Sequence, residues 1–167
     1  MENKKLFQLD IQIKQFLFTF IITLSFGVLI GLSYLYYTTN YIPSTAIERI
    51  NGSEINSSDE FNIPEQYPKP VSELLITTHN HIIAFSFIFF FTGGIFYYNS
   101  IIVGRIKQLM IIEPFISTII SFSSIWGMRY IHPGFVYVTA ISSSLIYISF
   151  FMMVSIIIYE LKFKKII

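Results

Sequence analysis

The sequence predicts an all-α integral membrane protein, a bundle of four membrane-spanning helices. Hydrophobic residues make up 53% of the 167 residues and charged residues only 13%, whereas soluble domains contain about 25% charged residues. The apolar residues fall into four runs, each long enough to cross a hydrocarbon core of about 30 Å. A soluble fold of this size could not bury so much apolar surface.

The first run covers residues 15–37 and contains no charged residue. It is too long for a signal peptide, and no small-residue cleavage site follows it, so we expect a retained span. Gly27 and Gly31 give this span a GxxxG spacing, which allows a second helix backbone to approach closely. Residues 38–73 form a polar, acidic loop with several prolines, in which a short amphipathic helix at residues 44–50 is the one regular element that we expect.

The remaining spans are expected at residues 74–98, 108–130 and 135–160. Ser72 is a candidate N-cap for the second span, and Glu73 suits the positive end of its helix dipole. Pro114 is expected to kink the third span. Because short turns join the last three spans, we expect them to be antiparallel neighbours in a single transmembrane domain that covers residues 1–167.

Lysine and arginine are distributed unevenly between the two ends of this bundle. One end carries eight of them (Lys4, Lys5, Lys14, Arg105, Lys107, Lys162, Lys164 and Lys165) and the other three (Arg49, Lys69 and Arg129). Cytoplasmic loops carry the excess of positive charge. The sequence therefore predicts a multi-pass protein of the cell's inner (plasma) membrane with both termini in the cytoplasm and the acidic loop outside.

Composition and motifs exclude several kinds of chemistry. The net charge of +1 gives no indication of a nucleic-acid partner, and the absence of cysteine excludes disulfides, thiolate metal sites, Fe–S clusters and covalently attached haem. We find no nucleophile elbow, P-loop or HExxH motif, and no catalytic residue can be named. The sequence therefore favours a protein without catalysis of its own.

All three histidines fall toward the outer end. His79 and His81, which flank Asn80, lie about two turns inside the second span, and His132 lies in the turn between the last two spans. Residues two apart on a helix point about 200° apart, so His79 and His81 cannot both ligate one ion on a regular helix. One of them is a candidate axial ligand of a b-type haem or a metal ligand, with His132 as a candidate second ligand. The alternative is that all three bind neighbouring polar groups. The sequence leaves open which of His79 and His81 faces the bundle interior.

Glu113 is a carboxylate roughly 9 Å into the third span. A buried glutamate at this depth could relay protons or remain neutral. The interpretation that we favour is that it reaches back toward Arg105 or Lys107 at the inner surface.

Two stretches resemble known proteins. "SELLITTHNHIIAFSFIFFFTGGIF" and "EPFISTIISFSSIWGMRYIHPGFVYV" resemble a family of small four-span bacterial inner-membrane proteins, uncharacterised in function, with a T-T-H-x-H start to the second span. "THNHIIAFSFIFFFTGGIF" is also similar to the haem-ligating second helix of haem–copper oxidase subunit I. That second resemblance covers one helix and implies His79 or His81 as the haem ligand, with Gly93 and Gly94 as the glycine pair.

Three functions remain in order of preference. The first is an accessory or structural subunit of a larger membrane complex, with the lipid bilayer and other subunits or further copies of the chain as its partners. The second is a haem- or metal-binding membrane redox protein. The third is a small transporter, for which the sequence offers neither an inverted repeat nor a broken midplane helix.

Overall fold

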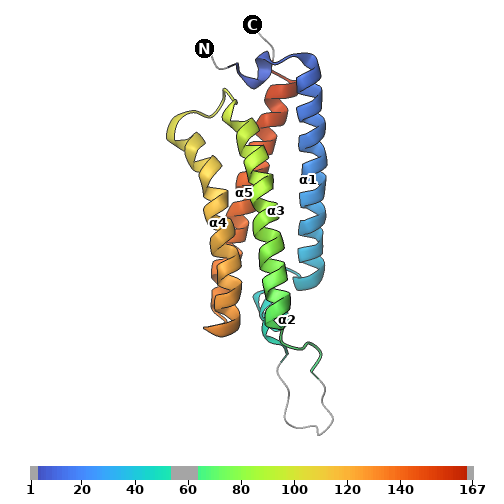
Figure 1. The fold of residues 1–167 in the computed structure, drawn as a ribbon, viewed down its shortest axis with the longest axis vertical. Helices are drawn as coiled ribbons and strands as arrows, with labels where there is room; N and C mark the ends of the chain where they lie inside the picture. Colours follow the sequence, from blue (N-terminus) through green and yellow to red (C-terminus); the bar gives the residue numbers. More distant parts are fainter. Residues whose placement is uncertain (1–3, 54–63, 165–167) are drawn as a thin grey trace.

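The computed structural model describes residues 4–53 and 64–164, in which helices are joined by turns and loops and no strand occurs. A 3₁₀ helix, η1, spans Leu6–Gln8. Five α-helices follow: α1 (Ile11–Thr39), α2 (Pro43–Asn51), α3 (Val71–Tyr97), α4 (Gly104–Tyr130) and α5 (Phe135–Lys162). Four of them, α1, α3, α4 and α5, are long and apolar enough to cross a membrane and run side by side along the molecule (Figure 1). The prediction of a helical membrane bundle is confirmed.

The helices end close to the ends of the predicted spans, but α1, α3 and α4 begin earlier, at Ile11, Val71 and Gly104 rather than at residues 15, 74 and 108. The start of α3 also differs in its cap. Its N-cap is Pro70, in extended conformation, so Ser72 is the second helical residue and its prediction as the N-cap is wrong. The reason is local, because proline fixes its own φ and suits the residue that precedes a first helical turn. Glu73 lies in the first turn as predicted.

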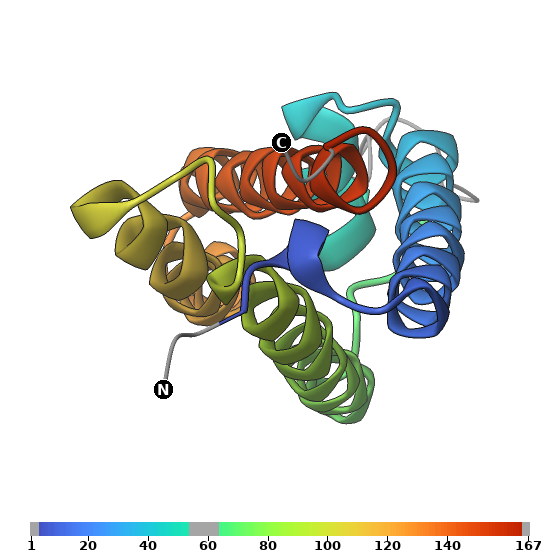
Figure 2. The same cartoon turned by 90° about the horizontal axis from the view of Figure 1, so that it is seen from above.

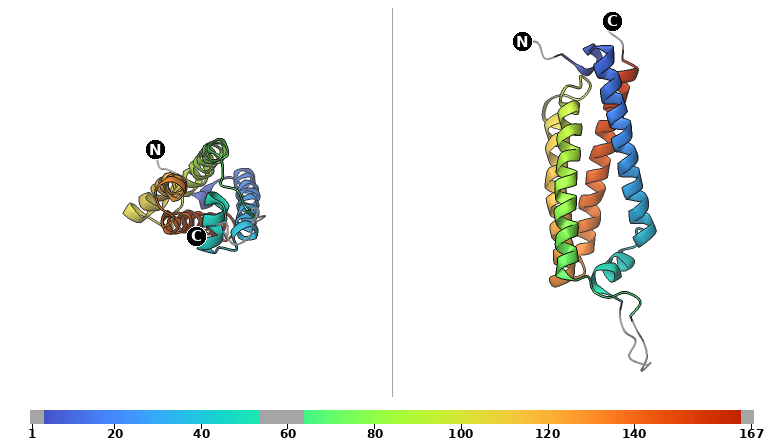
Figure 3. Two further views of the ribbon diagram at one scale, coloured as in Figure 1. Left: turned by 90° about the horizontal axis from the view of Figure 1, so that it is seen from below. Right: turned by 45° about the vertical axis from the view of Figure 1, so that its right-hand side comes forward.

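The polar loop contains α2, which confirms the short helix predicted at residues 44–50. Pro43 occupies its first turn, where a missing N–H costs nothing. Figure 3 shows α2 turning back from the lower end of α1 toward the ends of the other helices, and it contacts α1, α4 and α5. Much of the predicted acidity of this loop belongs to Glu54, Asp59 and Glu60, which lie outside the described residues.

Helix α5 is the centre of the bundle. It contacts α1, α2, α3, α4 and η1, and Figure 2 shows it between α4 and α1 with α3 opposite. Phe150, Met153 and Ile157 on α5 are fully buried, and Phe89 of α3 packs edge-on against Phe150 with ring centroids 6.3 Å apart. Helix α4 continues through Pro114 without a break; the kink expected there stays a prediction.

Helices α1 and α3 leave most of their surface outside the bundle. Only 11% of the most apolar 18-residue stretch is buried in each, against 39% in α4 and in α5. Within α1 the buried residues are Ile21, Val28 and Thr39. Large apolar side chains such as Phe16, Phe26 and Phe90 are more than half exposed, and in a membrane these surfaces face lipid or other protein. The chain is thus a multi-pass membrane protein in contact with the bilayer.

Candidate functional site

Three of the predicted residues, His79, Asn80 and His81, lie in the third turn of α3, and only His81 turns toward a neighbouring helix. Its ring lies 5.1 Å from the Phe122 ring of α4, centroid to centroid. Its Nδ1 lies 2.8 Å from the carbonyl oxygen of Thr77. Since a carbonyl can only accept, Nδ1 is the donor, and in the neutral ring this tautomer leaves the lone pair on Nε2. His81 thus borders the α3–α4 interface with one nitrogen available to a ligand.

The α3–α4 contact at this level is fixed by a side-chain hydrogen bond. Trp126 of α4 donates its Nε1–H to Thr78 Oγ1 at 2.9 Å. Thr78 and His81 are three residues apart and therefore share the inward face of α3. His79 and Asn80 lie on the remaining surface of the helix and are exposed. His81 is itself exposed, but of the two histidines it is the one whose ring packs against a ring of α4.

His132 and Glu73 are held by local contacts. His132 lies in the α4–α5 turn, where its Nδ1 accepts the backbone N–H of Gly134 at 2.9 Å. In that tautomer the proton is on Nε2. Glu73 is half exposed and pairs with Lys69, four residues earlier.

Among the described residues there is no group of three histidine or acidic side chains placed to hold a metal ion. Haem or metal ligation by the histidines stays a prediction.

Glu113 lies in the interface between α4 and α5, and the predicted contact with Arg105 or Lys107 is wrong. Its Oε2 accepts the hydroxyl of Ser149 on α5 at 2.5 Å, and its Oε1 accepts the hydroxyl of Ser117 one turn further along α4. Lys107 instead donates to the carbonyl oxygens of Tyr97 and Asn99. Burying a carboxyl group away from water is costly unless hydrogen bonds compensate, and the two serine hydroxyls supply these bonds within the apolar helices.

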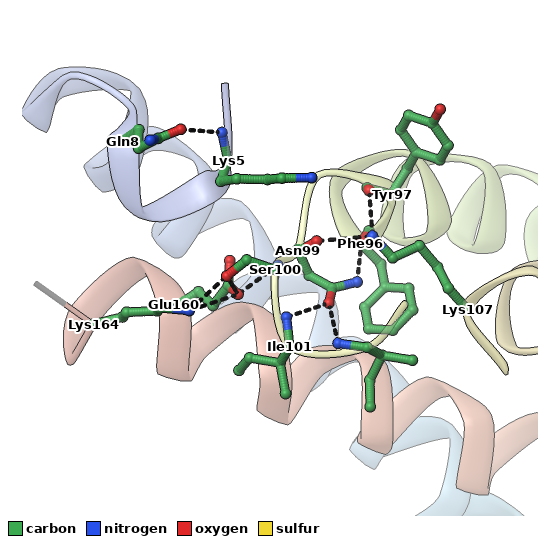
Figure 4. Close-up of polar contacts among 11 residues, drawn as sticks. Lys5, Gln8, Phe96, Tyr97, Asn99, Ser100, Ile101, Lys107, Glu160 and Lys164 are labelled. Atoms are coloured by element: carbon green, nitrogen blue, oxygen red, sulfur yellow. Dashed lines mark hydrogen bonds and ion pairs between the residues drawn. The ribbon is translucent and has the colours of Figure 1, made fainter. Parts of the chain in front are cut away.

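A polar cluster at the opposite end of the bundle was missed by sequence reasoning. Figure 4 shows Glu160 of α5 facing the α3–α4 loop, where its Oε1 accepts the backbone N–H of Ser100 at 2.6 Å and the Ser100 hydroxyl. Glu160 is completely buried, and the Lys164 ammonium lies 3.9 Å from the same oxygen. Lys164 also donates to the Ser100 hydroxyl at 2.6 Å. The cluster ties the last turn of α5 to the α3–α4 loop.

The loop is shaped by Asn99, which is also completely buried. Its Oδ1 accepts the N–H groups of Ile101 and Ile102 at 3.0 and 2.7 Å, and its amide donates to the Phe96 carbonyl. These bonds pair two N–H groups of the loop and tie the loop to a carbonyl in the last turn of α3. One sequence signal could have indicated the cluster: Glu160 is an acid in the last turn of a helix, where the dipole disfavours negative charge unless a specific partner is present.

Comparison with known proteins gives one match. A family model described as a transmembrane helical domain, Aq_1264_TM, matches residues 31–166. No curated protein and no solved structure matches the chain. The match covers the last part of α1, residues 31–39, and all of α2, α3, α4 and α5.

Proposed function

We propose, on the premise that this chain belongs to the Aq_1264_TM family of transmembrane helical domains, that it is an accessory, structural subunit of a larger membrane assembly. The proposal assigns no catalysis to the chain itself and treats residues 1–167 as one domain. The observation that carries it is a glycine pair on α1 that the bundle leaves uncovered.

Gly27 and Gly31 are exposed, and beyond the adjacent backbone of α1 itself a Cβ atom placed on either residue would meet no atom of the described residues within 4 Å. Helix–helix association in membranes depends on close backbone approach at small residues, because lipid gives no hydrophobic force between helices. No described residue packs against the pair, so we propose that this surface receives a helix of another chain.

The outward surface of α3 gives independent support. His79 and Asn80 are exposed, about 12 Å along the helix from Val71. Polar side chains at this depth are costly against lipid tails and are normally covered by protein or water. A partner helix that covers them removes this cost.

The charge distribution supports an orientation with both termini in the cytoplasm of the inner (plasma) membrane. Apart from Lys165, which is not described, the positive side chains predicted to be cytoplasmic lie near the ends of the chain and the α3–α4 loop, at the upper end of Figure 1. The end with α2 and the α4–α5 turn carries Arg49, Lys69 and Arg129, and the positive-inside rule places it outside.

The test is the size of the particle extracted from the native membrane in mild detergent. We expect the wild type to migrate well above its monomer mass of 19.4 kDa, and Gly27→Leu with Gly31→Leu to shift it toward the monomer. Co-purification of two differently tagged copies identifies further copies of this chain as the partner, and its absence identifies a different subunit.

The matched control is Ser33→Leu, an exposed position on the same helix. Ser33 lies about 200° around the helix from Gly31, so a bulky side chain there leaves the glycine surface open. A wild-type particle that is monomeric after cross-linking in intact membranes contradicts the proposal, as does an equal shift by Ser33→Leu.

A second candidate function, b-type haem binding, is favoured by the available Nε2 of His81. A bis-histidine site needs two ligating nitrogens, and His81 offers one. His132 does not offer the second in this tautomer, because its Nδ1 accepts the N–H of Gly134 and its Nε2 carries the proton. A second axial ligand then requires the other His132 tautomer or a second chain. When bound, a haem would supply electron-transfer chemistry.

An absorption spectrum of protein expressed with haem available, oxidised and dithionite-reduced, tests this second candidate. If haem binds, His81→Ala is expected to abolish the Soret band, while His79→Ala retains it because His79 lies on the outer surface of α3. Absence of the band from the wild type, or its persistence in His81→Ala, excludes His81 as a haem ligand.

A further inference from the structure

A small pocket lies at the end of the bundle that carries the termini. It holds about 230 Å³ and is lined by Lys5, Tyr97, Tyr98, Val103, Gly104 and Lys107. These residues come from three segments: the chain before η1, the end of α3 with its loop, and the start of α4. The backbone N–H of Leu6 donates to the carbonyl oxygen of Tyr98 at 3.2 Å, so the N-terminal segment is fixed beside the pocket.

Two ammonium groups share this pocket. Figure 4 shows the Lys5 side chain extended toward the loop that Lys107 reaches from α4. Lys107 donates to the carbonyl oxygens of Tyr97 and Asn99, at 3.0 and 2.8 Å. The ammonium of Lys5 donates to no described residue. The nearby carboxylate, Glu160, already accepts from Ser100. Two like charges in one half-buried pocket repel each other, and an anion between them reverses the sign of that interaction.

The start of α4 adds backbone donors to the same pocket. Its N-cap is Val103, whose side chain cannot cap, and the first turn contains no acid. The N–H groups of a first helical turn lack partners within the helix and lie at the positive end of its dipole, which together favour an anion. Gly104, at a φ of +65°, brings this backbone to the pocket without a side chain.

The pocket also lies at the depth where head groups are found. Tyr97 and Tyr98 are about half exposed, and tyrosines at the end of a membrane span lie at the head-group level. Basic pockets between helices on the cytoplasmic side suit phosphorylated head groups. From these contacts we propose that the Lys5–Lys107 pocket binds a phosphate group, carried by an anionic phospholipid or by free phosphate.

Native mass spectrometry of the delipidated full-length protein tests the proposal, with phosphatidylglycerol, phosphatidylcholine and inorganic phosphate as probes. We expect saturable binding of phosphatidylglycerol and not of phosphatidylcholine. Lys5→Gln should weaken that binding about fivefold, since one lysine contributes about 1 kcal/mol to attraction of an anionic lipid surface. Lys5→Arg should restore it. Millimolar inorganic phosphate that displaces the lipid identifies free phosphate as a ligand as well; failure to displace it identifies the head group alone.

The control is Lys162→Gln, at the same end of the bundle. Lys162 lies over the rings of Phe18 and Phe163 and does not line the pocket. Lys5→Gln keeps the hydrogen bond that the backbone N–H of residue 5 donates to the side-chain oxygen of Gln8. We therefore expect the variant to fold. Equal weakening by Lys5→Gln and Lys162→Gln, or no saturable binding of phosphatidylglycerol or inorganic phosphate, overturns the proposal. Neither of these two results tests the proposed contact of α1 with a helix of another chain, which is tested separately by the size of the extracted particle.

Discussion

At the scale of single residues, two carboxylates within the apolar helices are stabilised in different ways. Glu113 accepts hydroxyl groups from Ser117 and Ser149. Glu160 accepts the backbone and side chain of Ser100 and lies near the Lys164 ammonium. An unpaired charge in a low-dielectric site is very costly, so each donor is part of what permits the carboxylate there.

Replacing Glu160 by alanine should therefore be strongly destabilising. The change removes the acceptor of two Ser100 donors in a completely buried site, and we expect a loss of about 3 kcal/mol in the free energy of unfolding. Thermal and denaturant unfolding of the detergent-solubilised protein measures it. Glu73→Ala is the control: Glu73 is half exposed, and its loss should change stability by less than about 0.5 kcal/mol. Equal effects of the two variants contradict the assignment of Glu160 to a structural cluster.

At the scale of elements, the α4–α5 pair forms the tightest helix contact through small residues on α4. Ser117, Ser121, Ser124 and Gly127 are all buried, and Ser124 and Thr139 share a hydrogen bond of 2.6 Å across the interface. Small residues allow the two backbones to approach, and their hydroxyls add interhelical hydrogen bonds.

Gly127→Ala should disturb this contact. A Cβ atom at Gly127 would lie 2.7 Å from the Phe135 ring, well inside van der Waals contact, whereas Gly94 has open space at the same position. We expect Gly127→Ala to cost about 1–3 kcal/mol of unfolding free energy. Gly94→Ala should be neutral or stabilise the protein by up to about 1 kcal/mol, because alanine is the better helix former. The same unfolding assay compares the two, and similar results for both would exclude close packing at Gly127.

The α3–α4 contact can be followed through Trp126, the single tryptophan of the chain. Thr78→Val removes the acceptor of its indole N–H, and we expect an altered tryptophan emission maximum and a loss of about 1 kcal/mol in stability. Thr77→Val is the matched control, since the side chain of Thr77 makes no bond to the indole. If both variants leave the emission unchanged, the hydrogen bond does not form in solution.

At the scale of the whole molecule, the bundle has two chemically different ends. One end gathers most of the lysines, the buried Glu160 cluster and the proposed phosphate pocket. The other contains α2, His132 and Arg129. Such an asymmetry fixes the orientation of a membrane protein during insertion, when positive segments are retained in the cytoplasm.

Single-cysteine labelling tests this orientation directly, because the chain contains no cysteine of its own. Gln8→Cys and Glu65→Cys place a thiol at an exposed position at each end. In intact cells a membrane-impermeant maleimide should label the cysteine at position 65 and leave position 8 unlabelled until the cells are permeabilised. The reverse pattern would place the termini outside.

The sequence by itself determined the four spans and the grouping of the positive charges at one end. Both depend on local properties, the length of an apolar run and the charges beside it, so no knowledge of packing was needed. The short helix α2 was likewise predictable from Pro43 and the amphipathic pattern that follows it. The N-cap of α3 was misplaced by two residues, at Ser72 rather than Pro70, because both residue types are acceptable before a helix.

Only the tertiary structure decided which surface of each span faces inward. Apolar residues occupy every side of these helices, so periodicity could not show that His81 faces α4 and His79 faces away. For the same reason the sequence could not pair Glu113 with Ser149, 36 residues later, or Glu160 with Ser100, 60 residues earlier. Such contacts depend on the rotation of each helix within the bundle, and that rotation is set by packing among all the helices rather than by any one segment.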